Sequence, residues 1–464
     1  MSSRIAVLAS ALALSVVGCG TDGKGASSDG VPTTTTLTAT VPAIGRGWID
    51  GKPDWRGTSD EDFGDGAGKL SSDSAAPSEI ATAVGGGEDA VPSPTMAGGD
   101  VSGGRDLSAG SVDDNASFDD YLDYLARIHS LGIDLRDFDP TGRIVISVVD
   151  ATGLPVAGAD IAVTADGTEI AHVRTTADGT ARFHPALYGA AAATEFQFTA
   201  EGQSVTAAQN ESVSIVVDGP GGTDGPVAVD VLFLLDATGS MGDEIDQLKT
   251  SIDSVAAQVE QLQSDPDVRF AMTLYRDLGD QFVTSTFDFT SDVAEFRAAL
   301  AEVVADGGDD YPEAVDEGLA EALALPSWRD PASTIQLVFL VADAPPQVKR
   351  QVATPYPKSI ADAIGRGIKI FPVASSESDD QAEAVFRELA QATGSRFVFL
   401  TYGAGGAATG GSSDITRTDY EELALDQLVV RLITEELAAL TGDTVNVPPP
   451  TTSTTIPTTN PEGQ

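Results

Sequence analysis

The chain has 464 residues, of which 41% are hydrophobic, so it is long enough for more than one domain with a sizeable core. Its formal net charge of −45 argues against nucleic-acid binding, because basic patches supply the affinity in such proteins. It has three histidines and one cysteine, which excludes a disulfide within the chain and disfavours a zinc site of Cys and His ligands.

Residues 1–18 have the pattern of an export signal. Arg4 precedes an apolar stretch, residues 5–18, that is too short to span a bilayer as an ordinary helix. The stretch ends in VVGC, with a small glycine directly before Cys19. This pattern resembles the lipobox of bacterial lipoproteins, which implies that Cys19 becomes the lipidated first residue of the mature protein. We therefore expect an extracytoplasmic protein, lipid-anchored to a bacterial membrane or cell surface; the alternative is a plain signal peptide with a chance cysteine.

Residues 19–112 are predicted to be a disordered tether. Gly, Ser, Thr, Asp and Pro predominate there, and such a composition buries too little apolar surface to offset the loss of chain entropy on folding. The Thr- and Pro-rich tail, residues 442–464, has the same character. Residues 113–140 are predicted to contain a short helix, because the apolar residues between 118 and 125 fall on one helical face.

Short strands separated by turn residues are predicted in residues 141–218. RIVISVVD, EFQFTAEG and SVSIVVD alternate apolar and polar residues, and Asp-Gly pairs at 166–167 and 178–179 mark turns. The pattern predicts a small all-β sandwich. The string VVDATGLPVAGADIAV resembles carboxypeptidase-regulatory-like or Ig-like modules of exported proteins, which implies a spacer or adhesion scaffold without catalytic residues. A Gly-rich linker, residues 219–226, follows.

Residues 227–441 alternate between strand and helix patterns. Apolar runs of strand length, such as those at 227–235 and 335–344, are typical of strands buried on both faces. Helical periodicity separates them, for example over 243–262. The alternation predicts an α/β doubly wound, Rossmann-like domain with a mainly parallel sheet. We therefore expect a multidomain chain, in which this domain follows the sandwich and disordered segments lie at both ends.

Three oxygen-bearing side chains follow the first of these strands at every second position: Asp236, Thr238 and Ser240. Ligands of such sheets bind at the carboxyl ends of the strands, so a carboxylate and hydroxyls there predict a site for a hard cation. The pattern Asp-x-Thr-x-Ser resembles the metal-ion-dependent adhesion site (MIDAS) of von Willebrand factor type A (VWA) domains. The first motif of that family is Asp-x-Ser-x-Ser, and Thr238 keeps the hydroxyl.

The resemblance to VWA domains covers residues 227–441. VFLVADAPPQ matches the later strand whose terminal aspartate belongs to the site, which implies that Asp343 is a further ligand. ADGGDDYPEAV stands where many members have a threonine ligand after a glycine pair. That threonine is missing here, and Asp309 or Asp310 takes its place. The variant resembles a subgroup that also bears YRD, which is Tyr275–Asp277 in this chain.

The resemblance implies a divalent cation, with Mg²⁺ preferred over Mn²⁺ or Ca²⁺, and a protein partner that offers a carboxylate to the metal. We therefore expect a cell-envelope lipoprotein that binds an acidic ligand through this cation. The alternative is a metal-independent structural scaffold of the cell envelope. No enzyme is expected, because no histidine falls within residues 227–441 and a Ser/His/Asp constellation cannot be assembled there.

Overall fold

The computed structural model describes residues 55–58, 108–221, 227–259, 262, 265–308, 311–375, 378–401 and 423–441. The predicted signal peptide, Cys19 and the C-terminal tail lie outside these residues, and so do Asp309 and Asp310. In this described part, every helix is either too short or too polar to cross a membrane.

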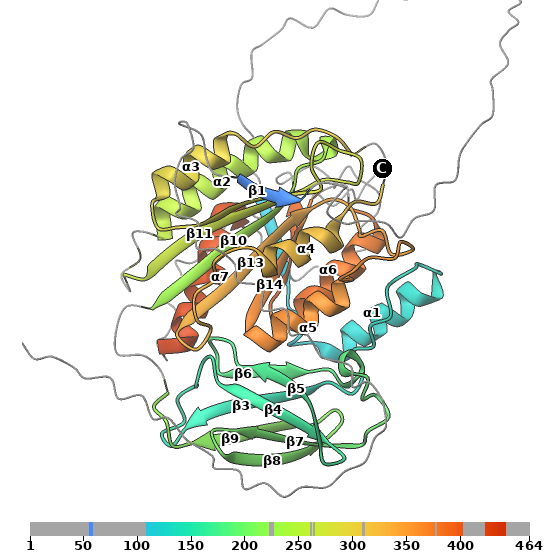
Figure 1. Ribbon diagram of the computed structural model, residues 1–464, viewed down its shortest axis with the longest axis vertical. Coiled ribbons are helices and arrows are strands. Elements are labelled where there is room, and N and C mark those ends of the chain that lie inside the picture. Colours follow the sequence, from blue (N-terminus) through green and yellow to red (C-terminus); the bar gives the residue numbers. More distant parts are fainter. Residues whose placement is uncertain are drawn as a thin grey trace, which may run out of the picture. The chain divides into compact units, whose positions relative to one another are not determined.

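A nine-stranded mixed sheet forms the larger domain of the described chain (Figure 1). Its strands are ordered β1-β12-β11-β10-β13-β14-β15-β2-β16, and β11, β10, β13, β14 and β15 run parallel to one another. The other strands pair antiparallel at the two edges. The strands span β1 Trp55–Thr58, β2 Ser108–Val112, β10 Ala228–Asp236, β11 Asp267–Tyr275, β12 Thr284–Thr290, β13 Thr334–Ala342, β14 Ile368–Ala374, β15 Phe397–Thr401 and β16 Leu423–Ala424.

Helices cover both faces of this sheet, because its central strands are apolar on both sides. Leu232 and Leu234 of β10 share a core with α4, α5 and α6, whereas Val231, Phe233 and Leu235 share a second core with α2, α3 and α7. The result is an α/β domain of Rossmann-like architecture, as the alternation of patterns predicted. The helices span α2 Gly242–Val259, α3 Val293–Ala301, α4 Val315–Ala324, α5 Tyr356–Arg366, α6 Asp380–Thr393 and α7 Leu425–Thr441, with a short 3-10 turn, η2, at Gly239–Met241.

Two segments of the predicted tether, 19–112, are strands of this sheet, which corrects the prediction at those positions. Strand β1 pairs with β12, and β2 lies between β15 and β16. The sequence of β2, SAGSV, is short and built of small residues, so it carries no periodic signal. It is a strand through its antiparallel pairing with β15 and β16, which also covers the edge of β15. Strand β16 consists of Leu423 and Ala424, directly before α7.

Residues 144–217 form two small sheets, here called the two-sheet module. One sheet has the order β6-β3-β9 and the other β5-β4-β7-β8. Alternate residues of β3, β4, β6 and β7 are buried. Phe183 of the first sheet contacts Phe196 and Phe198 of the second, with ring centroids 5.1 and 5.7 Å apart. The elements span β3 Ile144–Asp150, β4 Asp160–Ala165, β5 Thr168–Arg174, β6 Thr180–Phe183, η1 Pro185–Tyr188, β7 Glu195–Ala200, β8 Gln203–Ala208 and β9 Ser212–Val217.

Helix α1, Phe118–Ser130, confirms the predicted helical signal between residues 113 and 140. Its buried face consists of Tyr121, Tyr124, Leu125 and Ile128, which pack against Ala384 of α6. Just before the helix, a buried ion pair fixes the chain: Nε and Nη2 of Arg387 on α6 donate to the two carboxylate oxygens of Asp114, at 2.9 and 2.6 Å. The helix is therefore part of the larger domain's surface layer.

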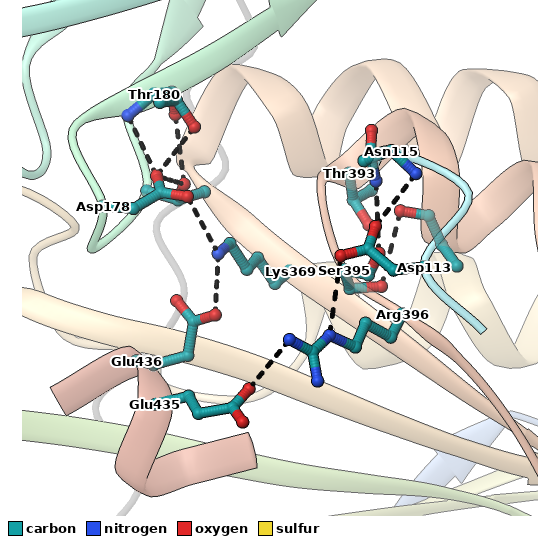
Figure 2. Close-up of polar contacts among 12 residues, drawn as sticks. Asp113, Asn115, Asp178, Thr180, Lys369, Thr393, Ser395, Arg396, Glu435 and Glu436 are labelled. Carbon is teal, nitrogen blue, oxygen red and sulfur yellow. Dashed lines mark hydrogen bonds and ion pairs between the residues drawn. The ribbon is translucent and has the colours of Figure 1, made fainter. Parts of the chain in front are cut away.

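Buried charges join the two-sheet module to the larger domain (Figure 2). Lys369 of β14 donates a hydrogen bond of 2.7 Å to Glu436 of α7 and lies 3.4 Å from the carboxylate of Asp178, in the turn before β6. Asp178 also accepts hydrogen bonds from the backbone N–H and the hydroxyl of Thr180. Because the Lys369 ammonium is buried, its charge is compensated from both sides of the junction.

Candidate metal centre

Strand β10 ends in Asp236 at the centre of the sheet, between β11 and β13. Asp236 and Thr238 are fully buried, whereas Ser240 is exposed. Asp236 Oδ1 accepts hydrogen bonds from the Thr238 backbone N–H at 3.0 Å and from the Thr238 hydroxyl at 2.7 Å. Thr238 Oγ1 and Ser240 Oγ lie 3.2 Å apart. The three side chains of the predicted motif therefore form one continuous row of oxygen atoms.

Asp343 follows the neighbouring parallel strand β13, so its carboxylate lies at the same carboxyl edge of the sheet as Asp236. Both side chains are buried. Burial and then the charge of Asp343 raise the pKa of Asp236. Hydrogen bonds from the hydroxyl and the backbone N–H of Thr238 oppose this rise. Two acidic groups on adjacent strands thus act on each other in a place with little solvent.

The loop that leads to Asp309 and Asp310 begins against this row. The Asp306 N–H donates to Ala237 O at 3.0 Å, and the Gly239 N–H donates to Gly307 O at 2.9 Å. The φ of Gly308 is +71°, and a Cβ atom there would lie 2.7 Å from both Glu313 Oε1 and Thr238 Cβ. A glycine is required because a side chain would enter the space between them.

The YRD segment supports the same loops. Arg276 is buried and donates to Ala237 O at 3.1 Å and to Val304 O at 2.9 Å, so it joins the loop after β10 to the one that leads to the glycine pair. Gln347 donates to both carboxylate oxygens of Asp277, at 3.0 and 2.9 Å. The motif was visible in the sequence, but these supporting roles depend on loops that only the fold brings together.

Glu313 is a residue of this centre that the sequence analysis missed. It lies within the quoted string YPEAV, directly before α4, and is 3% exposed. Burial and the charges of Asp236, Asp277, Asp343 and Asp280 raise its pKa to about 9. The one hint of this residue in the sequence is an acid two positions before the start of α4. That spacing alone is shared by many helix starts, at which acids interact favourably with the helix dipole.

The donor set is suited to a hard divalent cation, because carboxylate and hydroxyl oxygens are the ligands that Mg²⁺ and Ca²⁺ prefer. Within the residues that the structure describes, no three acidic, imidazole or thiol side chains come close enough to hold a metal ion by themselves. The predicted set of metal ligands therefore depends on the hydroxyls of Thr238 and Ser240 as well as on carboxylates. Two of its predicted carboxylates, Asp309 and Asp310, lie outside the described residues.

The three histidines lie on other elements. His129 is exposed near the end of α1, and His172 on β5 is exposed between Asp160 and Glu169, which raise its pKa through hydrogen bonds. His184, just after β6, is fully buried, and burial lowers its pKa to about 3. The chemistry of the centre is thus that of oxygen ligands.

Residues 230–402 match the family model of the von Willebrand factor A domain, and this part of the chain is a domain of that family. VWA domains are typically interaction modules. The match covers the strands from β10 to β15 and therefore contains all the residues of the centre described above.

Two curated proteins align with part of this chain. The alpha-protein kinase vwkA of Dictyostelium discoideum is 36% identical over 118 residues, which are 25% of this chain and 18% of that protein. The putative ariadne-like RING finger protein R811 of Acanthamoeba polyphaga mimivirus is 28% identical over 148 residues, 32% of this chain and 14% of that protein. The chain thus spans less than a fifth of either relative, and their kinase and RING finger names establish no enzymatic activity for it.

Among solved structures, proximal thread matrix protein 1 from the mussel byssus, in a form whose MIDAS motif is occupied by zinc, is similar in part. The two chains share 15% identity with a TM-score of 0.29, over 36% of this chain and 40% of the other.

Proposed function

We propose that the VWA domain of this chain binds a protein partner through a divalent cation at the carboxyl edge of its sheet. The observation that carries this proposal is the hydrogen-bonded row of Asp236, Thr238 and Ser240 at the end of the central strand. Asp343 adds a second buried carboxylate from the adjacent strand. Asp309 or Asp310 is proposed as the remaining acidic ligand, because the loop before them is bound to the loop of the motif.

The cation is proposed to be Mg²⁺, with Mn²⁺ and Ca²⁺ as alternatives. Mg²⁺ takes about six oxygen ligands in octahedral geometry, and the chain's own hydroxyls and carboxylates leave room for a ligand from outside. A partner carboxylate would occupy that position. Because the chain carries a net charge of −45, an acidic partner would be repelled in the absence of the cation.

The chain is further proposed to be a lipoprotein of the bacterial cell envelope, with Cys19 as the lipidated residue. The support is the sequence pattern that ends in VVGC. Replacing the thiol by Cys19→Ala should release the protein from the membrane fraction. Unchanged partitioning between membrane and soluble fractions would contradict lipid anchoring, while leaving the proposal for the metal site untouched.

The two-sheet module is proposed to be a spacer or adhesion scaffold of the carboxypeptidase-regulatory-like or Ig-like kind. Its support is the paired sheets with alternating buried residues and the Asp-Gly turn at residues 166–167, where both residues have positive φ. Its buried junction with the larger domain suits a rigid support for the VWA domain rather than an independent binding unit.

Calorimetric titration of the chain from residue 20 onward with Mg²⁺ and Mn²⁺ tests the site, and capture of envelope proteins with and without EDTA tests its use. We expect binding heat, and partners that are released by EDTA and regained with Mg²⁺. The Asp236→Asn variant is the control that should capture none of them. Absence of binding heat together with EDTA-resistant capture would instead support the alternative, a metal-independent scaffold of the envelope.

A further inference from the structure

Glu313 has a backbone position that places it beside the metal centre. Its N–H donates to Pro345 O at 3.0 Å, and a parallel bridge links it to Pro346. Both prolines lie in the loop that follows Asp343. The segment before α4 is therefore held against the loop after β13, and Glu313 cannot turn away from the carboxyl edge of the sheet without breaking this pairing.

The carboxylate of Glu313 is buried between the loops that form the centre. Its Oε1 and the side chain of Thr238 both lie beside Gly308, since a Cβ atom there would be 2.7 Å from each. Its Oε2 is buried and has no hydrogen-bond partner among the residues that the structure describes. A charged carboxylate that is buried without a hydrogen-bond partner destabilises the fold by several kcal/mol, unless a cation or a water interacts with it.

The chain's own bases do not supply that compensation in the described residues. The charges that act on Glu313 come from four acids: Asp236, Asp277, Asp343 and Asp280. Arg276 is directed elsewhere, to the carbonyls of Ala237 and Val304. When Glu313 is ionised, the charge that stabilises it therefore has to come from outside these residues, as a bound cation would supply it.

We propose that Glu313 is an additional carboxylate of the cation site, which accepts a hydrogen bond from a water bound to the metal. This inference rests on the proposed function of the site. The contact is proposed to pass through a water, because within the described residues no three acidic, imidazole or thiol side chains are placed to hold a metal by themselves. Such outer groups orient the ligands of a metal and add to its affinity. Glu313 is thus a positioning residue, and it adds a charge that the Asp-x-Thr-x-Ser motif does not contain.

The experiment compares the Mn²⁺ affinity of the chain from residue 20 onward with that of its variants. The affinity is measured by calorimetry and by the electron paramagnetic resonance signal of Mn²⁺. Glu313→Gln and Glu313→Met remove the charge at similar side-chain length, whereas Glu313→Asp keeps it. We expect both neutral variants to weaken Mn²⁺ binding about 10- to 100-fold, with partial recovery in Glu313→Asp. The control is Glu388→Gln, the same change at a buried glutamate that accepts a hydrogen bond from Tyr356, and it should bind Mn²⁺ like the wild type.

The metal-free thermal midpoint separates this role from a structural one. It should stay close to the wild-type value in Glu313→Gln, because the amide matches the size of the carboxyl group that it replaces and Oε2 makes no hydrogen bond within the described residues. Wild-type Mn²⁺ affinity in a folded neutral variant would overturn the proposal while leaving the cation site in place. Failure of both neutral variants to fold would also overturn it, since Glu313 would then serve the fold itself. Absence of Mn²⁺ binding in the wild type would overturn this proposal and the proposed function together.

Discussion

The hydroxyl of Thr238 donates a hydrogen bond of 2.7 Å to Oδ1 of Asp236, and both side chains are fully buried. This bond holds the hydroxyl next to the carboxylate. The backbone N–H of Thr238 donates to the same oxygen, so the conformation of the loop after β10 is tied to the charge of one aspartate.

The Asp236→Asn variant should lose Mg²⁺ binding without unfolding. The amide oxygen still accepts the hydrogen bonds of Thr238, while the charge that would bind the cation is gone. The metal-free thermal midpoint should be equal to that of the wild type or higher, because repulsion between Asp236 and Asp343 is relieved. Calorimetry with Mg²⁺ and thermal unfolding in EDTA measure the two effects. Wild-type Mg²⁺ affinity in this variant would refute the assignment of the site.

The Gly308→Ala variant should weaken Mn²⁺ binding, whereas the same substitution at a distant glycine with a similar φ should not. Gly308 has a φ of +71°, and a Cβ atom would contact Glu313 and Thr238 at 2.7 Å. The matched control is Gly132→Ala, because Gly132 has a φ of +73° with no atom within 4 Å of an added Cβ. In both variants the free energy of unfolding should fall by about 1–2 kcal/mol, because alanine is less stable than glycine in the left-handed conformation. Only Gly308→Ala should also lose Mn²⁺ affinity, and equal affinities in the two would contradict the described packing.

The metal-free protein should lose stability as the pH rises above neutrality. Burial raises the pKa of Glu388 from 4.5 to about 8, so the folded protein binds a proton that the unfolded chain releases, and stability falls as pH rises between those values. His184 has a lowered pKa and acts in the opposite direction only below 6.5. Between pH 6.5 and 8 the unfolding free energy should therefore fall by up to about 1.4 kcal/mol per pH unit for this group. Urea unfolding in EDTA should show a shallower fall in Glu388→Gln; identical slopes would exclude Glu388 as the source.

The Lys369→Met variant should destabilise the junction between the two-sheet module and the larger domain. Loss of the ammonium leaves Glu436 and Asp178 without their shared cation, and breaking a buried pair in this way costs about 3–5 kcal/mol. Lys349→Met is the control, because Lys349 forms an exposed pair with Asp134 that is worth less than about 1 kcal/mol. Thermal unfolding of both variants checks the difference. Equal midpoints would mean that the junction adds little to stability.

A chain that begins at residue 113 should be far less soluble than one that begins at residue 106. The shorter chain lacks β2, which covers the edge of β15 and buries Ala109 and Val112 in the sheet. An uncovered strand edge promotes pairing between chains. Size-exclusion chromatography of the two refolded chains compares their fractions of monomer. Equal monomer yields would show that the larger domain does not depend on β2.

The sequence by itself determined the alternation of buried strands and amphipathic helices between residues 227 and 441, because a strand buried on both faces reads as a continuous apolar run. It also determined that Asp236, Thr238 and Ser240 lie together, since residues this close in the chain share the end of one strand. The predicted helix at residues 113–140 and the Asp-Gly turn at 166–167 rest on equally local signals.

Only the tertiary structure decided what depends on contacts between distant segments. Strand β2 has no pattern of its own and exists because β15 and β16 pair with it. Glu313 lies beside the candidate metal centre because its segment pairs with the loop after Asp343, and both Glu313 and Thr238 lie next to Gly308. Lys369 is a buried junction residue because Asp178 and Glu436 approach it from far along the chain. The physical reason is the same in each case: burial, pairing and charge compensation are properties of neighbours in space, and no spacing along the chain encodes them.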